Sequence, residues 1–232
     1  GLKMSEGSSS TKGFMILSLA GIFAKVLSAF YVPLLNKIIG VEGVGIYSRS
    51  YDIFMFVYAI TSMGCQPAVA KVVAELRALG NERDAIKALK VSRKTYGIIG
   101  GALTIILMLL AYPIAKIGEI QNSTFAIMFL APSIFLTAIL SAYRGYFQGK
   151  NEMTGIAISQ VLEQFLNIFI SLLFAFLLYK ISIQLGAAGG TIGTSIGAVI
   201  AIFYLIYVYD KKKFEDIAYN TTNHEKKVSS KA

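Results

Sequence analysis

The stretch SAYRGYFQGKNEMTGIAISQVLEQFLNIF, Ser141–Phe169, contains a row of polar side chains inside a long apolar segment. With one further serine, these side chains are spaced i, i+3, i+4, i+7 and i+11: Gln160, Glu163, Gln164, Asn167 and Ser171. At about 100° per residue, all five fall on one face of a helix. In a water-soluble helix that face would point to solvent, so the rest of the chain decides where it points.

The composition indicates a membrane protein. The chain has 232 residues, of which 55% are hydrophobic and only 15% charged, whereas soluble domains contain about 25% charged residues. Several segments have the ~20 apolar residues needed to cross a hydrocarbon core of about 30 Å. We predict six spans, at residues 13–36, 44–64, 95–115, 124–143, 155–180 and 185–209. The expected fold is an all-α integral membrane bundle over residues 13–209.

The distribution of the cations predicts the orientation. Most of the 22 Lys and Arg residues lie before the first span, within 67–94, after the fourth span or after the sixth. The positive-inside rule then places both termini in the cytoplasm. It also accounts for the net charge of +9, so we expect no nucleic-acid partner. We expect a polar leader at 1–12, cytoplasmic helices within 67–94, and a flexible lysine-rich tail or inter-lobe linker at 210–232.

A basic stripe follows the second span. Arg83, Lys87, Lys90 and Lys94 are spaced i, i+4, i+7 and i+11 and so share one helix face. Two interpretations stay open: a solvated surface, or contact with membrane lipids through their anionic headgroups.

Two predicted spans each carry an ionisable group at mid-depth. Lys25 shares its helix face with Ser18, Gly21 and Ser28, while Glu163 lies within the polar row described above. A lysine at the centre of a bilayer needs a polar surrounding. We therefore expect Lys25 and Glu163 to line a common cavity or to pair directly. Either arrangement turns the polar row inward, and a purely structural ion pair is the simplest alternative.

The second span carries further polar and aromatic side chains. Arg49 and Asp52 are three residues apart and can pair along a helix. An aromatic row, Tyr47, Tyr51, Phe54 and Tyr58, is explained either by an interfacial belt or by a wall that stacks against sugar.

The sequence contains no recognisable catalytic motif, but it does contain a helix-packing motif. The sequence has one histidine and one cysteine, and no nucleophile lies at a recognisable spacing from a base. We therefore expect no enzyme activity, no cofactor and no metal site. In contrast, GAAGGTIGTSIGA, residues 186–198, places glycines four residues apart, which favours close packing of membrane helices.

Several stretches together resemble a known family. YRGYFQGKNEMTGIAISQVLEQFLNI at 143–168 resembles the signature of the polysaccharide transporter branch of the MATE-like (MOP) superfamily. GIFAKVLSAFYVPLLNKIIGVEGVGIY at 21–47, GCQPAVAKVVAEL at 64–76 and the glycine-rich stretch at 186–198 match in the expected order. That branch includes stage V sporulation protein B and the MurJ-type lipid II flippases.

The resemblance implies a function and a site. Such proteins have two six-helix lobes around a central cavity, and they move undecaprenyl-pyrophosphate-linked saccharides across the bacterial cytoplasmic membrane by alternating access. The chain is about half the usual length and resembles the N-terminal lobe, so activity would need a second lobe or a dimer. Lys25 matches a basic position of the first helix that is thought to hold pyrophosphate, whereas Tyr31 stands at the next such position. The expected substrate-binding residues are Lys25, Tyr31, Arg49, Gln160, Glu163, Gln164 and Asn167.

Two other functions stay open at this stage. A cation-coupled multidrug exporter of the same superfamily would need carboxylates in its cavity to bind cationic drugs. The positive charge of Lys25 is evidence against this function. A membrane scaffold that transports nothing would fit the short chain.

Overall fold

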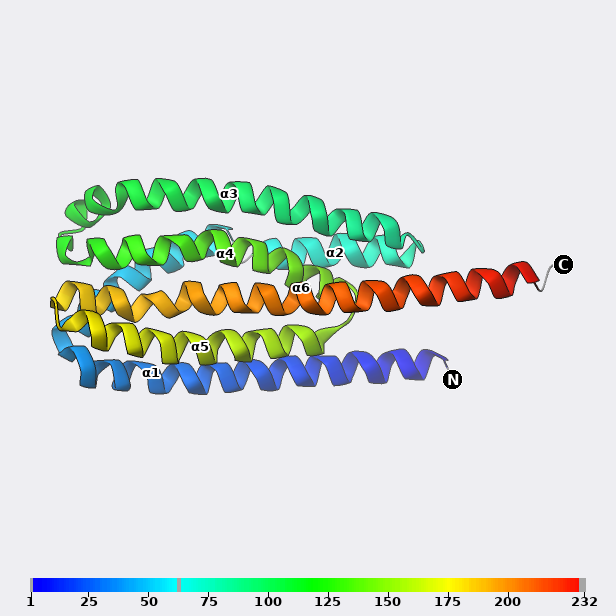
Figure 1. Ribbon diagram of the computed structural model, residues 1–232, viewed down its shortest axis with the longest axis horizontal. Coiled ribbons are helices and arrows are strands. Elements are labelled where there is room, and N and C mark those ends of the chain that lie inside the picture. The colour runs from blue at the N-terminus through cyan, green and yellow to red at the C-terminus, as the bar shows by residue number, and fades with distance from the viewer. Residues whose placement is uncertain (1, 62–63, 230–232) are drawn as a thin grey trace.

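The computed structural model describes residues 2–61 and 64–229, and its described part consists of helices joined by short turns. Figure 1 shows them as long, roughly parallel rods. In chain order they are α1 (Leu2–Thr61), α2 (Cys65–Ala78), α3 (Glu82–Ile117), the 3₁₀ turn η1 (Gln121–Ser123), α4 (Thr124–Gly149), α5 (Met153–Tyr179) and α6 (Ile183–Ser229).

α1 contains a reversal of the chain. Gly40 has φ 76° and ψ 177°, so the helix is interrupted there, and Figure 1 shows the chain turning back within α1. A positive φ is readily available to glycine and costly for other residues. The first half, 2–39, contains the predicted span 13–36, and the second half, 41–61, contains the predicted span 44–64 up to residue 61. Residues 62–63 of that span lie outside the described residues.

Five described regions have the length and hydropathy to cross a membrane, and the first of them, Thr11–Ala59, includes the reversal at Gly40. The protein is therefore a multi-pass membrane protein. The count of six spans and the cytoplasmic location of both ends stay predictions.

Three helices run further than the apolar segments alone indicate. α1 begins at Leu2, α3 continues from the basic stripe into its apolar segment without a break, and α6 continues to Ser229. Residues 210–229, expected as a flexible tail or inter-lobe linker, continue α6 as a helix.

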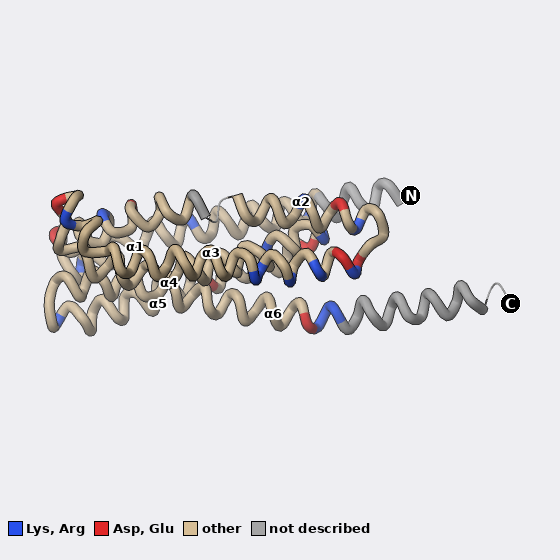
Figure 2. Tube along the Cα trace, turned by 90° about the horizontal axis from the view of Figure 1, so that it is seen from above, with Lys and Arg blue, Asp and Glu red and all other residues tan. Residues whose placement is uncertain are grey.

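The charges mark two ends of the bundle. The start of α1, the end of α6 and the α2–α3 turn all lie at the same end of the bundle (Figure 1). Charged residues of the described chain gather toward both ends of the bundle (Figure 2). The positive-inside rule assigns the end with both termini to the cytoplasm.

α5 and α6 approach each other backbone to backbone. A Cβ added to Gly189 or Gly197 would lie 2.6 Å from the carbonyl oxygen of Phe174 or Glu163, and one added to Gly193 would overlap the carbonyl of Asn167. The glycine ridge (Gly189, Gly193 and Gly197) therefore packs directly on the α5 backbone, as its spacing predicts.

α4 packs on α2 in the same way. A Cβ on Gly145 or Gly149 would lie 2.7 Å from the carbonyl oxygen of Gln66 or Ala70. Leu140, Phe147 and neighbouring side chains of α4 join residues of α2, α3 and α6 in one apolar core. α2 therefore belongs to the bundle and is not a detached surface helix.

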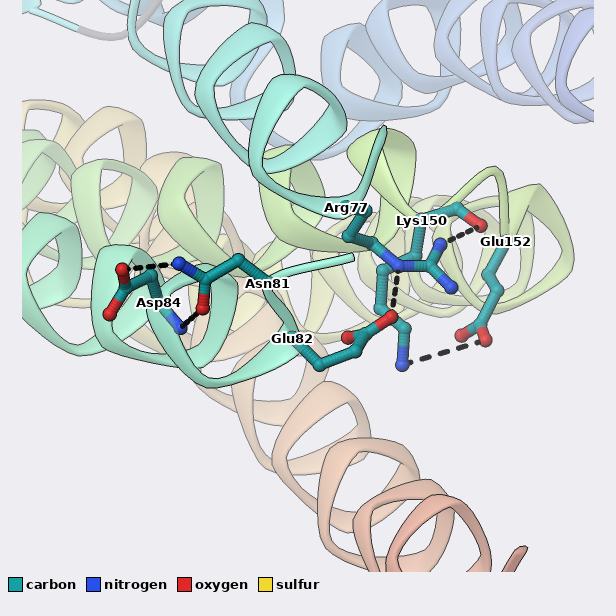
Figure 3. A network of polar contacts seen from close by, with 6 residues as sticks. All are labelled: Arg77, Asn81, Glu82, Asp84, Lys150 and Glu152. Carbon is teal, nitrogen blue, oxygen red and sulfur yellow. Dashed lines mark hydrogen bonds and ion pairs between the residues drawn. The ribbon is translucent and has the colours of Figure 1, made fainter. Parts of the chain in front are cut away.

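A polar network joins two turns at the same end of the bundle (Figure 3). Arg77, at the end of α2, lies 2.6 Å from the Glu82 carboxylate and donates a hydrogen bond of 3.0 Å to the carbonyl of Lys150. Asn81 caps α3 by accepting from the backbone N–H of Asp84 at 3.1 Å. The network fixes the α2–α3 turn against the α4–α5 turn.

The close contact between α5 and α6 predicts a strong effect of one methyl group. Gly193→Ala should lower the thermal midpoint of the purified protein, because the new Cβ meets backbone that cannot move aside, at a cost of about 1–3 kcal/mol. The matched control is Gly21→Ala, because a Cβ at Gly21 meets open space. Alanine there should be neutral or stabilising by up to about 1 kcal/mol. Equal midpoints for the two variants would contradict the packing.

Candidate transport groove

A polar groove lies between the two halves of α1 and α5. Its volume is about 320 Å³. Its lining comes from both halves of α1 and from the polar face of α5: Ser28, Tyr31, Val32, Tyr47, Ser48, Tyr51, Asp52, Gln164 and Asn167. We call it the α1–α5 groove. It exists because the reversal at Gly40 brings residues 28–32 beside residues 47–52.

The polar row of α5 faces other helices. Gln164 donates a hydrogen bond of 2.7 Å to Ser28 of α1. Asn167 accepts from Ser171 at 3.1 Å and from Thr194 of α6 at 3.4 Å, and Ser171 accepts from the Gly193 N–H at 2.9 Å. These bonds satisfy polar groups that lipid could not satisfy.

Glu163 has a partner that the sequence analysis did not assign to it. Its carboxylate lies 2.6 Å from the Arg144 guanidinium, which also donates to Ser159 at 3.2 Å. The expectation that Glu163 pairs directly with Lys25 is therefore wrong. Arg144 directly follows the predicted fourth span, 124–143, yet it lies within α4. Its long side chain can point back toward the N-terminal end of α4 and so toward mid-depth.

Lys25 lies near the α1–α5 groove but not in its lining. Its side chain is exposed, and it precedes Ser28 by one helical turn, a rise of about 4.5 Å. In the described part of the chain, Lys25 takes part in no ion pair. The structure therefore places this cation at the side of the groove toward the predicted cytoplasmic end.

The tyrosines of α1 form a continuous series of ring contacts. The ring centroids are 5.7 Å apart between Tyr31 and Tyr47, and 5.5 Å apart between Tyr47 and Tyr51. Tyr31 is buried and donates its hydroxyl hydrogen to the carbonyl of Gly190. Its ring lines the groove, but its hydroxyl is already hydrogen-bonded to the backbone of α6. Phe54, the next member of the row, is buried in a core with α3 and α4 and serves packing.

Two predicted site residues, Arg49 and Gln160, and the possible Arg49 partner Asp52 lie in or beside the groove. Asp52 lines it, while Arg49 is exposed on the adjoining helix face. Among the described side chains these two form no ion pair with each other. Gln160 is half-buried one turn toward the predicted cytoplasmic end from Gln164 and outside the lining.

The sequence analysis missed Arg144 as a site-forming residue. The available signal was the unpaired Glu163 in a span together with an arginine in the last two turns of the preceding span. Only the packing of both α4 and α5 on α6 decides that these two residues meet. Across the described residues, no three His, Cys, Asp or Glu side chains are close enough to hold a metal ion.

Comparison with known proteins places the chain. The sequence model described as "Polysaccharide biosynthesis protein" matches residues 10–230. The chain belongs to this family. Stage V sporulation protein B of Bacillus subtilis (strain 168) is 32% identical over 154 residues, which cover 66% of this chain and 30% of that protein. The lipid II flippase MurJ of the same organism is 26% identical over 164 residues, covering 67% and 30%. The match thus spans about a third of each relative's length. Together with the apolar helices, it identifies a multi-pass protein of the bacterial cell membrane.

Solved structures share the fold. The crystal structure of a MATE protein in the straight conformation aligns with a TM-score of 0.64 at 18% identity, over 92% of this chain and 46% of the other. An outward-facing multidrug resistance MATE family transporter of the MOP superfamily aligns with a TM-score of 0.66 at 18% identity, over 84% and 44%. The fold is therefore MATE-like, and the chain spans just under half of those structures.

The Arg144–Glu163 pair predicts a measurable coupling. Arg144→Met and Glu163→Met should each lower the thermal midpoint, because each leaves a part-buried charge without its partner. The double variant should lose less than the sum, by about 1–3 kcal/mol.

Arg77 and Glu82 provide the matched cycle. Their side chains are 33% and 39% exposed, against 12% and 24% for Arg144 and Glu163, so their coupling should stay below about 1 kcal/mol. Additive losses for Arg144 and Glu163 would show that the ion pair does not hold α4 to α5.

Proposed function

We propose that this chain is one lobe of a flippase that moves an undecaprenyl-pyrophosphate-linked saccharide, lipid II or another polysaccharide precursor, across the cytoplasmic membrane by alternating access. The observation that carries the proposal is the α1–α5 groove, with an uncompensated cation on each half of α1 beside it. Family membership supports the same substrate class.

The charge of the substrate explains the need for these cations. A pyrophosphate carries about two negative charges, and bringing it into a membrane cavity of low dielectric requires fixed positive charge nearby. Lys25 lies one turn before the groove-lining Ser28, and Arg49 adjoins Ser48. Because neither cation is neutralised by a described carboxylate, both can offer their charge to an anion.

The remaining lining suits a saccharide. Tyr47 and Tyr51 present aromatic rings, and the half-buried Gln164 and Asn167 present amides. Aromatic rings contribute large apolar contact areas with little loss of conformational entropy, and amides both donate and accept hydrogen bonds. A sugar ring, with apolar C–H faces and hydroxyl edges, fits such a wall.

Glu163 takes a different role from the one first considered. It holds Arg144 instead of acting as the counter-ion of Lys25. The Arg144–Glu163 ion pair thus links α4 to α5, and Lys25 needs no displaced partner before it meets the substrate.

Transport also requires a second element. Alternating access moves one bundle against another around a fixed site, and one groove on one lobe has nothing to rock against. We propose a second lobe or a second copy of the chain as that partner.

The multidrug alternative has one specific observation in its favour. Asp52 is the only charged residue among those that line the described groove, and a carboxylate would attract a cationic drug. Removing each charge separately distinguishes the two functions.

The test is carried out in the longest natural reading frame that contains this chain, in a strain depleted of its own flippase. Lys25→Ala should abolish complementation at normal membrane abundance, Lys25→Arg should retain part of it, and Asp52→Asn should retain most of it. The matched control is Lys37→Ala, which removes an exposed cation near the opposite end of the same half of α1. Full growth with Lys25→Ala would refute the role of this lysine. Loss with Asp52→Asn alone, together with loss of cationic-drug efflux, would favour the exporter.

A further inference from the structure

The outer face of α3 changes from apolar to basic along one line. Ile98, Ile105 and Leu109 are exposed, with 63%, 61% and 74% of their surface accessible. The basic stripe (Arg83, Lys87, Lys90 and Lys94) continues the same face toward the start of the helix, and all four side chains are exposed. Buried Ala85 and Leu89 on the opposite face fix this orientation. One helix face therefore meets hydrocarbon at one end and presents four cations at the other.

The charge of the stripe is not cancelled within the described protein. The described ion pairs link Arg77 with Glu82, Arg144 with Glu163, and Glu152 with Lys150 and Lys212. The nearest acid on the helix, Asp84, accepts a hydrogen bond of 2.6 Å from the Asn81 side chain as part of the cap of α3. Asn81 is neutral, so Asp84 keeps its negative charge in both hollows and can offset one of the four cations. The other three cations of the stripe have no described carboxylate left to neutralise them.

A hollow with an apolar floor lies beside the stripe. It has a volume of about 390 Å³ between α2 and α3, and its wall includes Val69, Val72, Val91 and Tyr96, with Lys87 at its edge. A second hollow of about 500 Å³ shares Asp84 and Lys87 with it and adds Arg83 and Lys90. Apolar and cationic surfaces are therefore continuous across one concave region.

The depth of the stripe matches the lipid headgroup layer. The apolar part of α3, residues 97–117, is about 30 Å long at 1.5 Å per residue, which equals the hydrocarbon thickness. Lys94 then lies about 4 Å beyond the hydrocarbon and Lys90 about 10 Å beyond it. Headgroups occupy this zone, and the positive-inside rule assigns it to the cytoplasmic leaflet.

We propose that the α2–α3 hollow and the basic stripe form a binding site for an anionic glycerophospholipid of the cytoplasmic leaflet. Lys87, Lys90 and Lys94 bind the headgroup phosphate, and the acyl chains lie along Ile98 and Ile105. This lipid is a bound component of the membrane and not the transported substrate. A zwitterionic lipid has no net charge to satisfy the stripe and is bound more weakly.

The absence of tryptophan from the sequence makes a direct measurement possible. The Ile98→Trp protein has one tryptophan, next to the stripe and at the edge of the hydrocarbon. It is placed in lipid vesicles of phosphatidylcholine with a minor fraction of phosphatidylglycerol whose chains are brominated near the headgroup. A second set of vesicles contains brominated phosphatidylcholine instead. We expect quenching that corresponds to at least about five-fold local enrichment of phosphatidylglycerol. This is the enrichment expected from the attraction of one cation at a membrane surface for anionic lipid.

Two triple variants with the same change in net charge separate the site from a general charge effect. Lys87→Gln/Lys90→Gln/Lys94→Gln should abolish the enrichment. Lys37→Gln/Lys116→Gln/Lys180→Gln removes three cations at the other end of the bundle and should preserve it. The Lys→Arg triple at 87, 90 and 94 keeps the charge and should also preserve the enrichment. This variant and the size-exclusion profiles of all variants control for folding.

Three results would overturn the proposal. The first is unchanged enrichment in the Lys87→Gln/Lys90→Gln/Lys94→Gln variant, and the second is an equal loss of enrichment in the two Gln triples. The third is equal enrichment at a second probe, Ile158→Trp, which is exposed on α5 toward the same end of the bundle. Quenching by neither lipid at Ile98→Trp would also overturn it, since it would mean that a protein segment covers the face.

Discussion

The close contact of α5 with α6 is the constraint on which the rest of the bundle depends. The glycine ridge brings the two backbones together, and this approach lets Asn167 and Ser171 bond to Thr194 and to the Gly193 N–H. Without it, Asn167 and Ser171 would lie in the membrane without their α6 partners, at a cost of several kcal/mol for each unsatisfied group. The glycine ridge therefore explains why a membrane helix can carry this polar face.

The same helix pair positions the groove. Gln164 and Asn167 of α5 form one wall of the α1–α5 groove. Tyr31 of α1 donates a hydrogen bond to the backbone of α6. Arg144 and Glu163 link α4 to α5. The groove thus lies on helices whose relative positions are fixed by packing and by an ion pair, and the exposed cations Lys25 and Arg49 lie beside it.

The sequence predicted most of the fold because membrane helices are encoded by local properties. The length of the apolar segments, the glycine spacing at 186–198 and the single-sided polar row of α5 each follow from one stretch of chain. Partners were harder to predict. Glu163 pairs with Arg144 rather than Lys25 because the packing of α4 and α5 on α6 decides which charges meet. In sequence, an arginine near a helix end resembles a loop residue. The helical continuation of α6 beyond residue 209 was missed because a lysine-rich segment has no apolar pattern to indicate it.

The central claim is that the α1–α5 groove contacts a lipid-linked saccharide, and site-specific photo-crosslinking tests it most directly. A photoreactive residue replaces Ser48, which lines the groove, or Phe56, which is 70% exposed on the same half of α1 and outside the lining. In membranes that contain radiolabelled undecaprenyl-pyrophosphate-linked saccharide, we predict a labelled adduct at position 48 and little at position 56. Equal labelling at the two positions, or none at position 48 in a protein that complements growth, would contradict the account.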